Sequence, residues 1–320
     1  MQKFLALFLI IVLFFSCKNI NKNQVDVSNI SINFKLDRFD IDFYDVPEKQ
    51  LSELKQHYSF LFPFGVHDSV WLKKRKDKDE QDLFVEVQKK YPTIDKLKNE
   101  LTLLFKHVKY YNTKFKSPRV VTMLTNIDYD HRVVYADSLM LISLDAYLGK
   151  KHEFYGEYPA YIKENNTKER IIIDVANSII NKQILTGKGR TFIHKMVYKG
   201  KKMYLLDAYL PMINDRIKIG YNELKYGWAK NNEEQIWQYF MEKDLLFSTD
   251  KSLDRRFLEI APFSKFYKEE DTLSPGRIGE WIGWQIVRSF MEKNDVSLHQ
   301  LIQTNEEEIF KKSNYKPRRK

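Results

Sequence analysis

Cysteine is almost absent from the 320-residue chain, which contains only Cys17. One cysteine cannot form an intramolecular disulfide, and it cannot supply the several thiolates of a structural zinc site. Glycine and proline are also sparse, at 11 and 9 residues, and no stretch rich in them divides the chain. With 43% hydrophobic residues and no internal repeat, residues 30–310 are predicted to form a single domain.

Motifs for metal binding and nucleophilic catalysis are missing as well. A His-Glu-x-x-His hydrolase needs two histidines one helical turn apart, and the seven histidines include no such pair. The nearest approach begins at His152, but its second ligand position is Gly156. The sequence also lacks a Gly-x-Ser-x-Gly elbow, a P-loop and a dinucleotide-binding glycine fingerprint. We predict no catalytic residues, no metal and no cofactor, although the 43 carboxylates leave an acid/base pair in three dimensions open.

Positive charge is in excess without forming a recognisable binding module. The chain has 53 Lys and Arg against 43 Asp and Glu, and the two signs are mixed along most of its length. The clearest basic block, residues 311–320, is interpreted as a solvated tail. Nucleic-acid binding favours basic residues interleaved with aromatic ones on one face, and the sequence shows no such pattern. No nucleic-acid partner is predicted.

The N-terminus resembles a bacterial lipoprotein signal peptide. A short positive region precedes an apolar run, residues 4–15, that is short for a membrane span and is followed by a small residue and Cys17. In such proteins the signal, here residues 1–16, is removed, and the cysteine carries acyl chains that anchor the protein in a membrane. Residues 17–29 are polar, as in a flexible tether. A secretory signal or membrane anchor with an incidental cysteine is the alternative.

The period of the apolar residues changes along the chain. The early segments predict a strand over residues 30–36 and an extended piece over 39–43. They then predict a helix opened by Asp45 and Pro47 and a later helix capped by Thr93. Between these helices, the charged run over residues 73–80 is interpreted as the start of a helix or a loop. Three short apolar runs, residues 119–124, 132–136 and 139–144, predict a sheet meander. Helices are then predicted over residues 170–183, 190–210, 222–230, 233–243, 275–292 and 297–310. Strands first and helices afterwards predict an α+β fold.

The stretch from residue 274 to 291 is the most distinctive. Ser274 and Pro275 are predicted to start a helix, because Ser is a good cap and Pro suits the first helical position. Apolar residues surround the helix axis, which predicts burial on all sides. Gly279 and Gly283 each cost about 1 kcal/mol relative to Ala in a helix, so we expect another backbone to come close to them.

Polar residues on the same helix need partners if it is buried. Arg277, Gln285 and Arg288 are therefore candidates for internal polar ties, and the helix is predicted to lie in the core, with Trp281 and Trp284. A ligand-lining helix is the alternative.

The predicted helix over residues 190–210 carries a polar stripe. Tyr198, Lys201 and Asp207 lie along it, beside Gly200. Their spacing alone favours a solvated or locally paired face over a binding groove, and the groove stays open as the alternative.

Together, several blocks resemble the gliding motility lipoprotein GldB family of Bacteroidota: the start at Cys17, the strand end at residues 142–149, and the helical segments 198–211 and 274–284. The resemblance implies a cell-envelope lipoprotein required for gliding, a process tied to type 9 secretion, with protein partners in that machinery. No Asp follows Cys17, so the expected location is the periplasmic face of the outer membrane.

More distantly, the order of elements resembles the zincin-like metalloprotease architecture, with a small antiparallel sheet and a mostly helical C-terminal half. In that fold the metal-binding helix follows the edge strand, which here gives residues 170–183. This segment offers Asp174, Asn177, Ser178 and Asn181 but no His. The resemblance therefore implies a non-catalytic descendant with a structural or assembly role. An envelope hydrolase with an unidentified site is the alternative.

Overall fold

The computed structural model describes residues 25–136, 138–184, 187 and 189–317. Its strands are β1 (Leu36–Arg38), β2 (Arg119–Met123), β3 (Val133–Ala136) and β4 (Leu139–Ser143), and they form one sheet in the order β1-β2-β4-β3. β1 and β4 both run parallel to β2, whereas β3 is antiparallel to β4. The fold is α+β, but the sheet is mixed, so the prediction of an antiparallel sheet is wrong.

The predicted meander fails because β4, and not β3, lies beside β2. Val121 of β2 is in register with Leu141 of β4, and Leu141 also faces Val134 of β3. The three central residues of β2 are buried, as expected for a strand covered on both faces. In β3 every second residue is exposed, including Val134, which suits the edge of the sheet.

The N-terminal prediction of extended structure is also wrong in part. Only Leu36–Arg38 pairs as a strand, and the next residues form helix α2 (Phe39–Asp45). Phe39 and Phe43 lie four residues apart, a spacing that fits one face of a helix as well as it fits a strand. Their rings are 5.3 Å apart, and the Phe39 ring is 4.9 Å from that of Tyr58. The spacing of the two phenylalanines does not distinguish a helix from a strand, and packing against Tyr58 favours the helix.

The remaining α-helices, in chain order, are α3 (Leu51–His57), α4 (Asp68–Lys76), α5 (Lys78–Lys90), α6 (Asp95–Tyr111), α7 (Ala160–Lys163), α8 (Lys168–Gln183), α9 (Phe192–Tyr209), α10 (Asp215–Ile219), α11 (Glu223–Asn231), α12 (Glu233–Glu242), α13 (Ser252–Phe257), α14 (Ile278–Lys293), α15 (Leu298–Gln303) and α16 (Glu306–Ser313). Short 3-10 turns lie at Glu48–Gln50, Ser59–Leu61, Leu144–Tyr147, Glu153–Tyr155 and Glu269–Leu273.

Several predicted helix boundaries differ from the observed ones. α2 ends at Asp45, and the helix expected to open there begins at Leu51 instead. Thr93 does not cap α6, whose N-cap is Ile94 without a side-chain hydrogen bond. The charged run 73–80 spans the end of α4 and the start of α5.

The helix predicted over residues 297–310 is two helices. Asn305 interrupts it, because its side chain accepts a hydrogen bond from the backbone N–H of Glu308 and caps α16. α16 continues through Ser313, beyond the predicted start of the basic tail at residue 311. Lys311 and Lys312 each pair with a glutamate one turn earlier on this helix.

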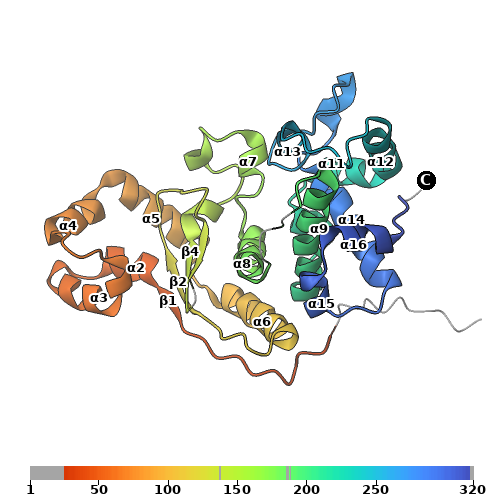
Figure 1. Ribbon diagram of the computed structural model, residues 1–320. Helices are drawn as coiled ribbons and strands as arrows, with labels where there is room; N and C mark the ends of the chain where they lie inside the picture. Colours follow the sequence, from red (N-terminus) through yellow and green to blue (C-terminus); the bar gives the residue numbers. More distant parts are fainter. Residues whose placement is uncertain (1–24, 137, 185–186, 188, 318–320) are drawn as a thin grey trace, which may run out of the picture.

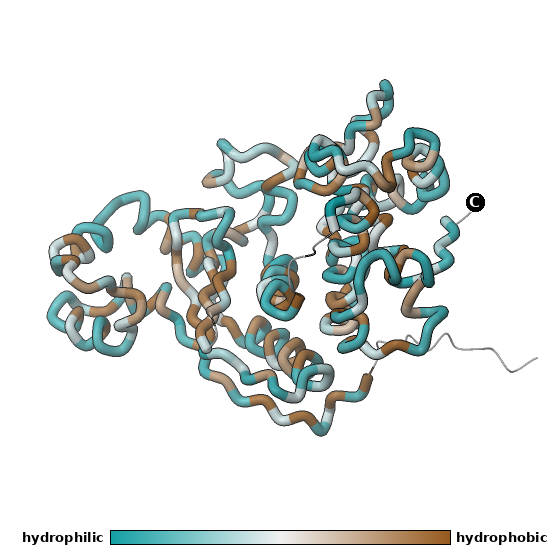
Figure 2. The backbone as a smooth tube through the Cα atoms, in the orientation of Figure 1, coloured by the Kyte–Doolittle hydropathy of each residue, from teal (hydrophilic) through white to brown (hydrophobic). Residues whose placement is uncertain are grey.

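Helix α8 lies between the two parts of the fold (Figure 1). The sheet and helices α2 to α5 are on one side of it, and the later helices, including α9 and α14, are on the other. α9 and α14 make the most extensive contact between any two helices in the described residues, and α8 packs against both β3 and α9. Hydrophobic residues run along strands β2 and β4, whereas the peripheral helix α3 is mostly hydrophilic (Figure 2).

Candidate functional site

Two glycines bring the backbones of α9 and α14 into contact. A Cβ on Gly283 would fall on the carbonyl oxygen of Met196 and lie 2.5 Å from its carbonyl carbon. A Cβ on Gly200 would fall on the carbonyl group of Gly283 and lie 2.8 Å from the backbone nitrogen of Trp284. A Cβ on Gly279, one turn earlier, would lie 2.9 Å from the side chain of Leu258 and 3.1 Å from the backbone oxygen of Phe257. The close approach expected near Gly279 and Gly283 therefore exists, and α9 is the helix that makes its backbone contact at Gly283.

Helix α14 begins later than predicted. Its N-cap is Arg277, in the left-handed region at φ 59° and ψ 32°, and no side chain caps the helix. The hydroxyl of Ser274 instead accepts a hydrogen bond from the backbone N–H of Ser264, 3.0 Å away, and Pro275 lies before the helix. The prediction that Ser274 caps α14 and that Pro275 is its first residue is wrong, because Ser274 ties two loops together.

Asp207 is the centre of a buried ionic network. Its Oδ1 accepts hydrogen bonds at 2.8 Å from both Lys218 and Arg288, and its Oδ2 accepts from Trp284 Nε1 at 2.9 Å and from Arg288 Nε at 2.8 Å. Arg288 also pairs with Asp215. Burial opposes the charge of Arg288, but the two carboxylates raise its pKa above the usual value. Two acids and two bases balance, so this end of the polar stripe is locally paired.

The other sequence-predicted residues are also packed or paired. Lys201 is buried and donates hydrogen bonds to Glu306 and to the backbone oxygen of Thr304, both at 2.9 Å. Tyr198 is half-buried, with the ammonium group of Lys202 4.7 Å from its ring centroid. Trp281 is buried, and its ring lies 5.8 Å from that of Trp284. The structure thus brings Asp207 and Trp284 together and leaves Lys201 and Tyr198 in separate surroundings.

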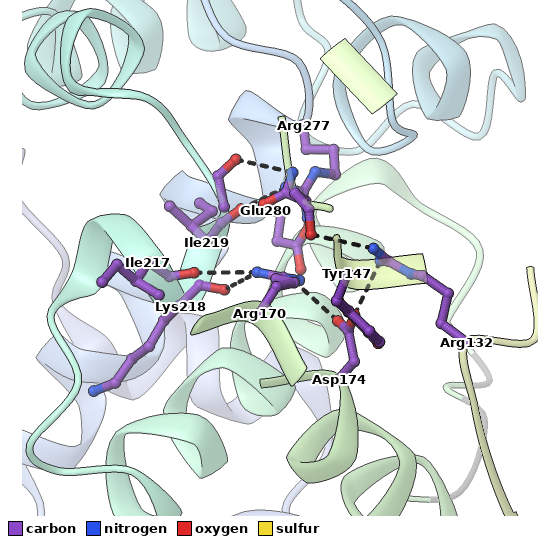
Figure 3. A network of polar contacts seen from close by, with 11 residues as sticks. Arg132, Tyr147, Arg170, Asp174, Ile217, Lys218, Ile219, Arg277 and Glu280 are labelled. Carbon is purple, nitrogen blue, oxygen red and sulfur yellow. Dashed lines mark hydrogen bonds and ion pairs between the residues drawn. The ribbon is translucent and has the colours of Figure 1, made fainter. Parts of the chain in front are cut away.

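A second network lies on α8 and was not predicted. Arg170 and Asp174 are one helical turn apart, and Arg170 Nε donates to Asp174 Oδ1 at 3.0 Å. Arg132, just before β3, places its Nη2 3.0 Å from the other oxygen, Oδ2, which also accepts a hydrogen bond from the hydroxyl of Tyr147 at 2.9 Å. One carboxylate is therefore shared by two guanidinium groups and a phenol (Figure 3).

Arg170 also fixes the end of α10. Its Nη1 donates to the backbone oxygens of Ile217 and Lys218, both at 3.1 Å, and Arg277 donates to that of Ile219. These carbonyl groups lie at the C-terminal end of a short helix, where most lack an intrahelical partner; that of Ile217 also accepts from the backbone N–H of Gly220. Arg277 is held in turn by Glu280, with Nη1 and Oε2 3.2 Å apart. Figure 3 shows the three arginines converging on one place from different segments of the chain.

A cavity of about 320 Å³ opens beside these arginines. It is lined by residues of the loop before β3, α7, α8 and the start of α11, and by the segments 260–262 and 275–277. We call it the arginine pocket, because Arg132, Arg170 and Arg277 all contribute to its wall, together with Lys225. It lies where the sheet-bearing part of the fold meets the helical part.

Burial changes the pKa values of the basic side chains that line the arginine pocket. Burial, reinforced by Arg277 and Arg132, lowers the pKa of Arg170. Burial also lowers the pKa of Lys225. For Arg132, burial acts in the same direction, but Asp174 and the neighbouring tyrosines together outweigh it and the pKa is raised.

A metal ion does not fit the α8 network. The zincin-like resemblance would place ligands one turn apart on this helix, and the pair found there is Arg170 and Asp174. A guanidinium has no acceptor atom for a metal, and both oxygens of Asp174 are already used. Within the described residues, no group of three or more His, Cys, Asp or Glu side chains lies in position to hold a metal.

Comparison with known families decides what kind of protein this is. A family model described as gliding motility protein GldB matches residues 20–317, nearly the whole chain. The chain belongs to the GldB family. No curated protein and no solved structure was found to match it.

GldB-family membership makes the chain a lipoprotein associated with gliding motility, which fits the cell envelope, membrane association and protein partners. The predicted signal, residues 1–16, and Cys17 lie outside the described residues. Among the helices described, none is long and apolar enough to cross a membrane.

Sequence reasoning missed the arginine pocket for a simple reason. Arg132, Arg170 and Arg277 stand in segments far apart along the chain, and no short motif joins them. The available signal was indirect: the motif-like spacing of Arg170 and Asp174, four residues apart on the helix singled out by the zincin-like resemblance.

Proposed function

We propose that this GldB-family protein is an outer-membrane lipoprotein that acts as a structural or assembly component of the gliding and type 9 secretion apparatus. Cys17 anchors it by acyl chains at the periplasmic face, and the polar segment that follows, residues 17–29, spaces the domain from the membrane. The observation that carries a structural role is the sharing of the Asp174 carboxylate between Arg132 and Arg170.

We also propose that the fold is zincin-like. Support comes from the antiparallel edge strand β3, from α8 following the β3–β4 hairpin and packing against β3, and from α14 as a buried closing helix. In this architecture the metal-binding pair would lie on α8, where Arg170 and Asp174 form an ion pair instead. Two guanidinium groups supply the positive charge beside this carboxylate in place of a metal ion. The polar residues of α8 therefore make internal contacts that stabilise the fold.

Replacement of Cys17 by Ala tests the anchor. Cells whose only copy carries Cys17→Ala should incorporate no radiolabelled palmitate into the protein, should release it from membranes, and should lose colony spreading. Immunoblots must show comparable protein levels, because reduced abundance would abolish gliding without testing the anchor. Palmitate remaining on the variant, or full spreading with soluble protein, would overturn the proposed anchoring.

Co-purification and metal analysis test the structural role. Wild-type protein isolated from cross-linked envelopes should bring down components of the gliding or secretion machinery, and should contain no stoichiometric zinc. Chelators should leave its melting temperature unchanged, since a metal bound only by the folded state would stabilise it. Stoichiometric zinc with chelator-sensitive gliding would favour the envelope hydrolase, and the absence of any envelope partner would contradict an assembly role.

A further inference from the structure

The positive charge of the arginine pocket is not fully compensated. Arg132 and Arg170 share one carboxylate, that of Asp174, although each carries a full charge. Lys225 donates its hydrogen bonds to backbone oxygens of Thr272 and Ser274, which are uncharged.

The remaining charges near the arginine pocket do not change this balance. Arg277 is matched by Glu280. The acid on the pocket wall, Glu164, is paired with Lys150 at 2.8 Å. The four cations of the wall are thus directly balanced by two carboxylates, Asp174 and Glu280.

Some donor groups of these side chains also remain available. Arg170 uses its Nε and Nη1, and Arg132 its Nη2, in the contacts described above. Arg132 Nη1 donates to the backbone oxygen of Asn165, 3.3 Å away. Arg170 Nη2 and Arg132 Nε take part in none of the hydrogen bonds found within the described part of the chain. Asp207 gives the contrast, because there two acids balance two bases around Arg288.

The rest of the wall is apolar and aromatic. Tyr129, Tyr161 and Tyr221 line the arginine pocket with Ile260 and Pro262. The guanidinium of Arg132 lies 4.6 Å from the ring centroid of Tyr129, within the range of a cation–π contact. A volume of about 320 Å³ is at the small end of ligand sites and admits a compact molecule or one end of a longer one.

We propose that the arginine pocket binds an oxyanion, a carboxylate or a phosphate, carried on an apolar or aromatic body. Arginine is the side chain best suited to such groups, since its planar fork matches two oxygens at once. The anion would complete the charge balance beside Arg170 and Lys225, while its apolar body would rest on the tyrosine and Ile260 side of the wall. The proposal adds a ligand site to a protein whose proposed role is structural.

The test uses variants that remove no structural contact. Arg170→Gln would release the carbonyl groups of Ile217 and Lys218, so loss of binding would not be separable from misfolding. Ile260 is 52% exposed and lines the pocket, so Ile260→Glu places a negative charge on its wall. Ile260→Gln is the uncharged control of equal size. Phe64→Glu adds the same charge at a fully exposed site that precedes α4 in the other part of the fold.

The full-length lipoprotein, purified in detergent from envelope membranes, is titrated calorimetrically with hydrocinnamate, phenyl phosphate and the neutral amide hydrocinnamide. At least one acid should bind, more weakly at high salt, and the amide should bind at least about tenfold more weakly. Ile260→Glu should weaken binding of the acid by about tenfold or more, because like charges repel strongly in a partly buried site. Ile260→Gln loses an apolar contact but adds no charge, so it should weaken binding of the acid clearly less than Ile260→Glu does, and Phe64→Glu should bind like the wild type.

The two acids distinguish the source of the oxyanion. Tighter binding of hydrocinnamate indicates a carboxylate ligand, and tighter binding of phenyl phosphate indicates a phosphate ligand. No binding of either acid, equal binding of the amide, or unchanged affinity in Ile260→Glu would each overturn the proposal.

Discussion

Gly283→Ala sets helix propensity against packing at the crossing of α9 and α14. In an isolated helix the substitution would stabilise by about 1 kcal/mol, because glycine loses more backbone freedom than alanine. In the folded protein the new methyl group would fall on the carbonyl oxygen of Met196. That atom belongs to the backbone of a long helix, so it cannot rotate away as a flexible side chain would.

The magnitude follows from what must move. Relief of the clash requires α9 and α14 to separate, and this would loosen the packing around Trp284 and stretch its hydrogen bond to Asp207. Overpacking in a well-packed core costs about 1–3 kcal/mol and occasionally more, and a backbone clash belongs at the upper end of that range. After subtraction of the propensity gain, the net loss of unfolding free energy should be about 2 kcal/mol or more.

Gly227 provides a matched control. It lies inside α11, and a Cβ there would meet no atom within 4 Å. Gly227→Ala should therefore raise the unfolding free energy by up to about 1 kcal/mol. Denaturant unfolding of both variants, followed by circular dichroism with equal m-values, gives the comparison. A Gly283→Ala protein as stable as the wild type would refute the backbone contact between α9 and α14.

Two further predictions concern buried carboxylates. Asp207→Asn should lower the unfolding free energy by about 3–5 kcal/mol, because it leaves the buried Lys218 and the half-buried Arg288 with one carboxylate, that of Asp215, between them. Asp254→Asn, at a partly exposed pair, is the control and should cost less than about 1 kcal/mol; equal losses would contradict a special role for Asp207. Burial raises the pKa of Asp145 from 3.8 to about 6, against hydrogen bonds from the backbone N–H groups of Ile127 and Thr125. Because the folded state holds this proton more tightly, its contribution to stability is greatest below about pH 4 and is lost, by about 3 kcal/mol, as pH rises to about 6. Asp145→Asn should remove this part of the pH dependence in denaturant titrations, and an unchanged profile would show that another group is responsible.

The positions of the long helices in the second half of the chain were predictable from the sequence. α8, α9, α11, α12 and α14 all lie within three residues of their predicted positions, because a helix repeats its apolar face locally and few alternatives match the pattern. The glycine pair on α14 likewise indicated a close neighbour, since a buried helix tolerates glycine mainly where space is short.

Other features depended on contacts between distant segments. Short apolar runs predicted the segments of β2, β3 and β4, but they carried no information on which strand lies beside which. Phe39 and Phe43 fitted a helix and a strand equally, and the ring of Tyr58 decided between them. The sequence predicted Ser274 as a helix cap, but in the structure its hydroxyl accepts a hydrogen bond from the backbone N–H of Ser264.

The same distinction holds for the sites. The sequence by itself determined that histidine- and cysteine-based metal motifs are missing and that the chain resembles the GldB family, because both depend on residue identity and spacing. It could not bring Arg132, Arg170 and Arg277 to one pocket or place Lys218 and Arg288 on Asp207. Charge pairing acts over a few ångströms in space, whatever the separation along the chain, so only the tertiary structure decided which charges meet.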